Sequence, residues 1–320
     1  MLIQRNFFMK PIKSNVNIAI GNFDGIHLGH KLIIEKLIKI KENTKDKTLI
    51  LSFNPHPVKV LKPEKWQKNI LKFRTKYFIL KSLGVDILFL LSFNKKFSEI
   101  TAKEFITEIL IKRLKANNIL IGKDFRFGNN REGDTEMLLS YAKKNYFNVV
   151  VFEKRKISDN VISSSIIRKK LIKGEIEKAN NFLGYCWEID GRVTRGAAKG
   201  RDLGFPTANV KYTYQLAPSN GIYACWAKIE NDQDWRMAAV STGYRPQFNG
   251  KEKLLEVHFL KFSCNVYHKR IRVVFVKKIR EEQVFDSENQ LINQMNKDCK
   301  TIEDILKQEV ISENKKFSYE

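Results

Sequence analysis

The chain has few cysteines, few acidic side chains and no long apolar run. Its four cysteines, Cys186, Cys225, Cys264 and Cys299, form no CxxC pair, which argues against a zinc cluster and against a disulfide framework. No stretch approaches the roughly 18 uncharged apolar residues of a membrane span, and the N-terminus has no signal-like apolar core. We therefore expect reduced thiols in a cytoplasmic protein.

The scarcity of acidic residues leaves a net charge of +23, from 58 Lys and Arg against 35 Asp and Glu. Such a balance can indicate an anionic partner, such as nucleic acid, a membrane surface or a phosphorylated small molecule. Most of the basic residues are lysine, and the chain is rich in Ile and Asn, as a coding bias toward A and T would produce. Because arginine reads nucleic acid best, we expect neither a nucleic acid nor a membrane as partner.

The first half of the chain alternates short apolar strands with amphipathic helices. This alternation favours a parallel sheet with helices on both faces, in which ligands bind where the strands end. The expected strands cover residues 17–20, 48–53, 86–91, 118–121 and 148–152, and the expected helices cover residues 31–41, 75–83, 102–114, 136–144 and 163–179.

The pattern changes near residue 185, where β-branched or alternating runs separated by turns take over. Many short strands favour a small antiparallel barrel or sandwich. We place the domain boundary between residues 183 and 184, which gives domains 1–183 and 184–320, and we expect a last helix over residues 287–308. The expected strands cover residues 187–193, 221–229, 237–241, 254–262 and 271–279.

A glycine-rich stretch, GNFDGIHLGH from Gly21 to His30, joins the first expected strand to the first expected helix. The N-terminus of a helix offers free N–H groups and a partial positive charge, which suits a phosphate. His27 and His30 are three residues apart and can lie on one side of the helix start. There they could donate to phosphate oxygens as charge builds on a leaving pyrophosphate. The alternatives are a zinc pair, which would need further ligands, and a pair of surface histidines with satisfied hydrogen bonds.

The pattern GxFDGxHxGH resembles the nucleotidyltransferase superfamily, which transfers a nucleoside monophosphate from ATP and releases pyrophosphate. Three further segments lie at expected strand or helix ends: NPHP at 54–57, IGKDFRFG at 121–128 and SSSIIR at 163–168. Together they are similar to the FMN adenylyltransferase module of the bacterial bifunctional riboflavin kinase/FAD synthetases, with a Rossmann-like fold. The resemblance implies that His27 and His30 are catalytic, that the nucleotide contacts Gly21, Phe23, Asp24, Gly25, Gly29, Ser163, Ser164, Ser165 and Arg168, and that the flavin contacts Asn54, Pro55, His56, Asp124 and Phe125.

Some of these residues have simpler interpretations. Phe125 and Phe127 could belong to the core, and Ser163 could be only a helix N-cap. Arg168 lies one turn into its helix, where a cation is badly placed for the helix dipole, so an anionic partner is the more economical explanation. The family usually has Thr where this chain has Ser165, which keeps the hydroxyl.

A second glycine-rich stretch runs from Gly191 to Asn209 and carries cations between its glycines. It is neither a Walker P-loop nor a Rossmann fingerprint, although such a loop can still wrap phosphates with its N–H groups. Thr207 and Asn209 are two apart in an extended segment and so face one side. A hydroxyl and an amide oxygen suit Mg²⁺. An ordinary turn in a basic protein is the alternative.

This stretch resembles the signature of riboflavin kinase, and PSNGIY at 218–223 and LEVHF at 255–259 agree with it. Alternation places Glu256 and His258 on one strand face. The resemblance implies a six-stranded antiparallel barrel with a C-terminal helix, and Glu256 as the base that takes the proton of the attacking hydroxyl. It also implies that Mg²⁺ is held by Thr207 and Asn209 and that ATP is bound by Gly196, Lys199, Gly200, Arg201, Thr207 and Asn209.

Three departures from the kinase pattern bear on how well the substrate is positioned. The family usually has Asn where this chain has Ser241, Thr where it has Gln247, and Asp where it has Lys261. Arg280, Phe285 and Asp298 continue the family's C-terminal pattern, so the resemblance covers nearly the whole chain.

We expect a bifunctional enzyme, a monomer or weak homo-oligomer, that acts on riboflavin, FMN and ATP. It would phosphorylate riboflavin to FMN and then adenylate FMN to FAD with release of pyrophosphate. One alternative is an adenylyltransferase with a degenerate, regulatory kinase domain. Another is an RNA-binding protein with a nucleotide-binding fold, which would interleave aromatic residues with Arg on the barrel strands.

Overall fold

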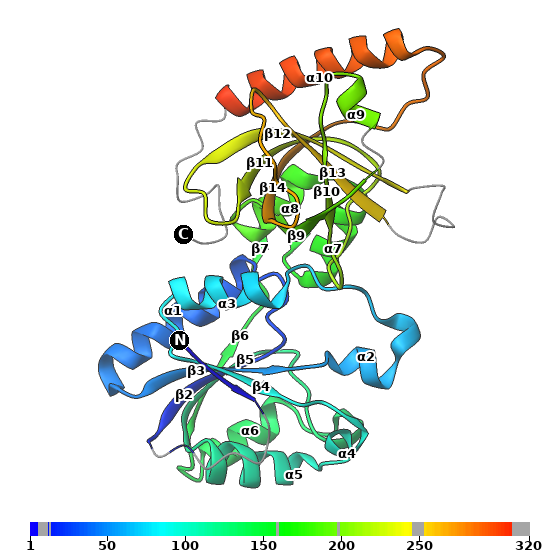
Figure 1. The fold of residues 1–320 in the computed structure, drawn as a ribbon. Coiled ribbons are helices and arrows are strands. Elements are labelled where there is room, and N and C mark those ends of the chain that lie inside the picture. The colour runs from blue at the N-terminus through cyan, green and yellow to red at the C-terminus, as the bar shows by residue number, and fades with distance from the viewer. Residues whose placement is uncertain (6–11, 13, 158–159, 197–198, 245–252, 309–320) are drawn as a thin grey trace. The chain divides into compact units, whose positions relative to one another are not determined.

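The structure is a computed structural model that describes residues 1–5, 12, 14–157, 160–196, 199–244 and 253–308 (Figure 1). The chain forms two compact units. The first comprises Met1–Gln67 and Lys76–Ser163, and the second comprises Lys68–Thr75 and Ser164–Glu320. The helices that follow Ser163 therefore belong to the second compact unit. The domain boundary expected between residues 183 and 184 stays a prediction.

A six-stranded sheet in the order β1-β4-β3-β2-β5-β6 forms the centre of the first unit, and every pair in it is parallel. The chain builds β2, β3 and β4 toward one edge and then returns to the other side of β2 with β5. A topological switch therefore lies between β2 and β5, the place where such sheets open a crevice. The strands are β1 Leu2–Arg5, β2 Val16–Ile20, β3 Lys47–Phe53, β4 Ile87–Leu91, β5 Ala116–Gly122 and β6 Asn148–Phe152.

Helices cover both faces of this sheet, as the alternation predicted (Figure 1). The strands β2, β3 and β4 are buried on both sides, which explains why they consist of almost continuous apolar residues. The helix expected over residues 102–114 begins as α-helix and continues as a π-helix, η2. The helical segments are α1 Leu28–Thr44, α2 Pro57–Leu61, η1 Pro63–Lys65, α3 Phe73–Ser82, α4 Lys95–Ser98, α5 Ala102–Glu104, η2 Phe105–Arg113, η3 Asn129–Arg131 and α6 Thr135–Ala142.

A closed antiparallel barrel of six strands, in the order β10-β13-β12-β11-β14-β9, forms the second unit. The barrel, rather than a sandwich, is therefore the fold of this half. The helix α10 (Glu288–Gln308) packs Ile302 and Leu306 against the outside of the barrel. The strands are β9 Glu188–Thr194, β10 Ala208–Lys211, β11 Gly221–Ile229, β12 Trp235–Tyr244, β13 Lys253–Phe259 and β14 Arg270–Arg280, and a short helix, α9 Lys199–Asp202, precedes β10.

The helix expected over residues 163–179 is two helices, α7 (Ser164–Ile172) and α8 (Ile176–Leu183). The break falls at Gly174, whose φ of +74° is left-handed and whose missing Cβ would lie 2.3 Å from the Ser219 hydroxyl oxygen. A left-handed glycine C-cap, with Glu175 N–H donating to the carbonyl of Lys170 (2.9 Å), therefore ends the helix there. A small antiparallel pair, β7 (Lys156–Ile157) and β8 (Asn160–Val161), comes before α7.

The segment Lys68–Thr75 belongs to the second unit although it lies far from the barrel strands in sequence. The carbonyl of Ile70 accepts hydrogen bonds from the indole of Trp187 (2.8 Å) and the amide of Gln215 (3.1 Å). The hydroxyl of Thr75 donates to the buried carboxylate of Glu188 (2.8 Å). The segment is thus part of the packing of the barrel. None of the helices in the described ranges combines the length and the apolarity that a membrane span needs.

Candidate active sites

The loop after β2 brings the two imidazoles of the glycine-rich motif together. The Nδ1 atom of His27 caps α1 by accepting the backbone N–H of His30 (3.3 Å). The two rings stack with centroids 3.7 Å apart and planes 15° apart. His27 is buried and His30 half-buried. The spacing of three residues therefore does place both rings on one side of the helix start.

The backbone of this loop is held in conformations that ordinary residues avoid. Phe23 has a φ of +46° and Ile26 a φ of +35°, and both side chains are fully buried. Gly25, at φ +89°, shares the turn. A Cβ at Gly29 would lie 3.2 Å from the His27 ring, so a larger residue there would crowd that imidazole. Packing thus fixes the path from β2 into α1.

Two further residues of the motif complete this loop. A Cβ at Gly21 would lie 3.3 Å from the ring of Phe23, so the small residue lets that ring pack against the loop. The carboxylate of Asp24 is largely buried and acts electrostatically on Lys76.

Burial keeps both imidazoles neutral. It lowers the pKa of His27 to about 4, and it lowers the pKa of His30 well below its usual value, with the charges of His27 and Lys76 adding to the effect. Because Nδ1 of His27 accepts a hydrogen bond, its proton is on Nε2. In the parts of the chain that the structure describes, no group of three or more His, Cys, Asp and Glu is placed to hold a metal.

The buried His27 makes the stability of the first unit depend on pH. Its pKa is about 4 in the folded chain and near 6.5 in the unfolded chain, so between these values the unfolded chain binds a proton that the folded chain excludes. His27 by itself should therefore lower the free energy of unfolding by about 1–2 kcal/mol as the pH drops from 6.5 to 5, and His30, whose pKa is also lowered by burial, adds to this fall. Urea unfolding at several pH values measures this, with hydrogen exchange over residues 16–44 identifying the transition.

His27→Asn is the matching variant, since asparagine can still cap the helix. It should lose the contribution of His27 and keep that of His30, whereas His268→Asn, at an exposed position whose left-handed φ suits asparagine, should keep the full pH dependence. Equal pH slopes for wild type and His27→Asn would contradict the prediction.

The loop after β3 touches the glycine-rich loop. Its His56 caps α2, with Nδ1 accepting the N–H of Val58 (3.1 Å), and its Nε2 lies 2.9 Å from the side-chain amide of Asn22. Asn54 donates its N–H to the carbonyl of Leu91 (2.9 Å), and the Asn54–Pro55 peptide bond is cis. The segments expected to contact flavin and nucleotide therefore meet at the ends of adjacent parallel strands.

The loop after β5 borders the switch point from the other side. Asp124 is exposed and pairs with Lys154, while Phe125 is half-buried and stacks on Phe127, with ring centroids 5.4 Å apart. Phe127 is part of the core, and Phe125 packs against that core with one face. The core interpretation thus holds fully for Phe127 and in part for Phe125.

The serine run and Arg168 are divided between the units. Ser163 ends the first unit, whereas Ser164, Ser165 and Arg168 lie on α7 of the second unit, where the Arg168 Nε donates to the carbonyl of Lys68 (3.3 Å). The first unit therefore contains the imidazole pair, whereas α7 with Ser164, Ser165 and Arg168 belongs to the second unit.

One residue close to the imidazoles was not expected from the sequence. Lys76, on α3, donates to the carbonyl of Asn22 (2.6 Å) and to the hydroxyl of Ser52 (2.8 Å). The signal available in the sequence is its position, because Lys76 is three and four residues before Ile79 and Leu80, which are buried. A lysine on the apolar stripe of a helix indicates a buried partner.

On the barrel, the strand register places Glu256 between Asn209 on β10 and Ser241 on β12. Paired residues of antiparallel strands share a face. The neighbours Leu255 and Val257 are buried inside the barrel, so Glu256 points outward. Alternation in LEVHF predicted that Glu256 and His258 share one strand face, and the same period places Asn209 of β10 and Thr207, which directly precedes β10, on one side of their segment.

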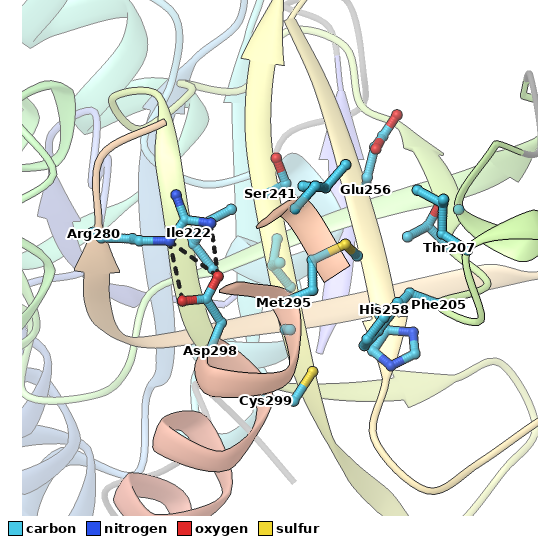
Figure 2. A pocket seen from close by; sticks show the side chains of 15 residues that line it. Phe205, Thr207, Ile222, Ser241, Glu256, His258, Arg280, Met295, Asp298 and Cys299 are labelled. Atoms are coloured by element: carbon cyan, nitrogen blue, oxygen red, sulfur yellow. Dashed lines mark hydrogen bonds and ion pairs between the residues drawn. The ribbon is translucent and has the colours of Figure 1, made fainter. Parts of the chain in front are cut away.

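A cavity of about 270 Å³ opens on this outer face (Figure 2). Figure 2 shows Thr207 and Glu256 near one end and an ion pair between Arg280 and Asp298 near the other, with Met295 of α10 between them. The cavity therefore lies between the strands and the helix that covers them. Its lining consists of Gly200, Leu203, Phe205, Thr207, Ile222, Ala239, Val240, Ser241, Glu256, His258, Arg280, Leu291, Met295, Asp298 and Cys299.

Two ion pairs attach α10 to the barrel. Asp298 is buried and accepts hydrogen bonds from Arg280 Nη2 (2.7 Å) and Gln294 Nε2 (2.9 Å). Lys261, where the family usually has Asp, contacts Glu303 of α10 at 2.5 Å. Hydrogen bonds from Lys261 and Lys307 lower the pKa of Glu303 to about 2. The departure at Lys261 thus forms a contact with the helix outside the cavity.

The glycine-rich stretch approaches the same cavity through α9. A Cβ at Gly200 would lie 2.5 Å from the carbonyl oxygen of Phe205, so this position requires glycine. Arg201 is exposed, and Gly196 precedes α9. The side chain of Lys199 and residue Gln247 lie outside what the structure describes.

Comparison with known proteins agrees with both halves of the chain. Residues 9–166 match the family described as FAD synthetase, and residues 183–306 match the family described as riboflavin kinase. Fold and matches together define a two-domain enzyme of flavin nucleotide synthesis. The chain is 36% identical over 298 residues to the bifunctional riboflavin kinase/FMN adenylyltransferase of Buchnera aphidicola subsp. Schizaphis graminum. The aligned residues cover 92% of this chain and 95% of that protein. The chain belongs to the bifunctional riboflavin kinase/FMN adenylyltransferase family.

Two more relatives span most of the chain. The protein of the same name from Escherichia coli K12 is 33% identical over 281 residues, 88% of this chain and 90% of that protein. A crystal structure titled macrolide-efflux protein, from Streptococcus pneumoniae, superposes with a TM-score of 0.84 at 28% identity over 95% of this chain and 99% of that chain. The whole two-unit architecture therefore recurs in a solved structure.

Proposed function

We propose that the two activities of this chain use two separate sites, one in each unit. The chain phosphorylates riboflavin to FMN with ATP and then adenylates FMN to FAD with release of pyrophosphate. The observation that carries the proposal is that each unit has its own group of polar side chains where its fold opens. These are the stacked imidazoles at the start of α1, and the Thr207, Asn209 and Glu256 face of the barrel.

In the first unit, the phosphate of FMN attacks the α-phosphorus of ATP, and pyrophosphate leaves. The nucleophile is already an anion, so the protein needs no covalent intermediate and no strong base. The neutral imidazoles of His27 and His30 donate N–H groups, and the N-terminus of α1 adds its partial positive charge, to the oxygens on which charge develops. The loop of Asn54 and His56 beside them would hold the flavin substrate.

In the barrel, the 5′-hydroxyl of riboflavin attacks the γ-phosphorus of ATP, and ADP leaves. Glu256 takes the hydroxyl proton as the new P–O bond forms. Its place between Asn209 and Ser241, at the edge of a cavity walled by α10, supports that role. Backbone N–H groups around Gly200 would hold the phosphates.

The barrel site also suits Mg²⁺. The hydroxyl of Thr207, which directly precedes β10, lines the cavity together with the carboxylate of Glu256, and Asn209 pairs with Glu256 across the strands, so that the three offer a set of hard oxygen donors. Mg²⁺ prefers such donors together with waters and substrate phosphates, and when bound it would neutralise charge on the transferred phosphoryl group. Thr207 and Asn209 are the residues that would hold it.

The purified chain tests the proposal directly. Incubation with riboflavin, ATP and Mg²⁺ should convert riboflavin to FMN and then to FAD, with ADP and pyrophosphate as coproducts. Chromatographic separation of the three flavins measures the conversion. Removal of Mg²⁺ by a chelator should stop FMN formation, and added Mg²⁺ should restore it. FAD formation from FMN without any FMN formation from riboflavin would instead indicate a degenerate kinase domain.

A further inference from the structure

Lys76 occupies the point where the two substrate loops of the first unit meet. Its half-buried side chain reaches from α3 to the carbonyl of Asn22 (2.6 Å) and the hydroxyl of Ser52 (2.8 Å). Ser52 is fully buried near the end of β3, and its hydroxyl also donates to the carbonyl of Asn22 (3.2 Å). The ammonium therefore joins the end of β2 to the end of β3.

Asn22 extends this connection to the loop expected to hold the flavin. Its backbone carbonyl accepts from Lys76, while its side-chain amide lies 2.9 Å from Nε2 of His56. The next residue, Phe23, has a left-handed φ and packs its ring 5.0 Å from that of His30. One residue thus transmits the position of the ammonium to both the imidazole pair and the loop after β3.

We propose that Lys76 is a positioning residue for FMN adenylylation. Its ammonium fixes Asn22, and so sets the loop that carries His27 against the loop that carries His56. The proposal rests on the assignment of adenylylation to the first unit. Loss of the ammonium would leave the carbonyl of Asn22 with one hydrogen bond fewer and would let the two loops shift relative to each other.

The electrostatics agree with this geometry. Burial lowers the pKa of Lys76 to about 8, while the carboxylate of Asp24, in the loop after β2, opposes that effect. The charge of Lys76 in turn contributes to the low pKa of His30 on α1. These two are the titratable groups found facing it within the described chain. At neutral pH the lysine is charged and His30 is neutral.

Three variants, assayed for FAD formation from FMN and ATP, test the proposal. Lys76→Met should lower kcat/KM for FMN by about 100-fold, while FMN formation from riboflavin stays unchanged. Lys76→Arg should recover most of the loss at pH 7. Lys81→Met, at an exposed lysine on the same helix, should behave as wild type.

The pH profile separates positioning by the ammonium from simple support of the fold. Wild-type kcat/KM for FMN should decline above about pH 8 as Lys76 loses its proton, whereas Lys76→Arg should stay flat through pH 9, because arginine keeps its charge. A flat wild-type profile overturns the proposal even if the variants fold poorly. So does a folded Lys76→Met within about threefold of wild type.

The variant His30→Ala distinguishes a wrong role for Lys76 from a wrong assignment of the adenylylation site. If it abolishes FAD formation while a folded Lys76→Met stays within about threefold of wild type, the site is correctly assigned and the role of Lys76 is wrong. If His30→Ala leaves FAD formation intact, the assignment of the site itself fails.

Discussion

Replacing His30 by alanine should abolish practical FAD formation and leave FMN formation intact. The His30 ring stacks on His27 beside the start of α1, and in the proposed mechanism its neutral imidazole donates to the phosphates of ATP. Removal of one such donor lowers kcat by about 10²–10³-fold, equivalent to roughly 2.7–4 kcal/mol in the barrier. The assay supplies FMN and ATP and measures FAD and pyrophosphate, and a separate assay supplies riboflavin and measures FMN.

Lys36→Ala is the control for this prediction. Lys36 is exposed on the same helix, so its removal changes the charge of α1 without touching the imidazole pair. Both activities should remain near those of wild type. A folded His30→Ala protein that has lost both activities would contradict the assignment of two separate sites.

Replacing Glu256 by alanine should have the opposite effect. FMN formation from riboflavin should fall by about 10²–10⁴-fold, the usual contribution of a positioned general base. FAD formation must here be assayed from supplied FMN, because the variant makes none of its own, and it should be unchanged. Glu256 lies on the barrel face with Thr207 and Asn209, and none of these residues belongs to the first unit.

Glu256→Gln and Glu288→Gln sharpen this test. The first keeps the size of the side chain but removes the base, so it should be nearly as impaired as Glu256→Ala. The second changes an exposed carboxylate at the start of α10 and should leave both activities unchanged. Retention of FMN formation by Glu256→Gln would show that the proton leaves by another route.

The spacing of apolar residues along the chain correctly predicted most of the longer strands and helices. Alternation in LEVHF predicted that Glu256 and His258 share one strand face, because side chains of a strand alternate strictly, and the structure places Leu255 and Val257 of the other face in the core. Local sequence patterns did not predict structure that depends on contacts between residues distant in the sequence. The four-residue strands β1 and β10 are too short to show a period.

The site could be anticipated in part. The glycine-rich loop, the NPHP loop and the segment after β5 were expected at strand ends, and the order of the sheet places those ends next to one another. Lys76 was not anticipated, because a lysine in a helix is normally exposed and its partners, Asn22 and Ser52, are distant in sequence. The roles of the individual residues stay predictions until the variants are measured.

By itself, the sequence determined the two fold classes, the family and the motifs that carry phosphate chemistry. These depend on periodicity and on residue types at fixed short spacings, which any contiguous stretch contains. The tertiary structure alone decided that a switch point lies between β2 and β5, that Lys68–Thr75 packs with the barrel, and that Lys76 reaches Asn22. Such pairings join residues far apart in the chain, and their energy comes from burial and charge that exist only once the chain has folded.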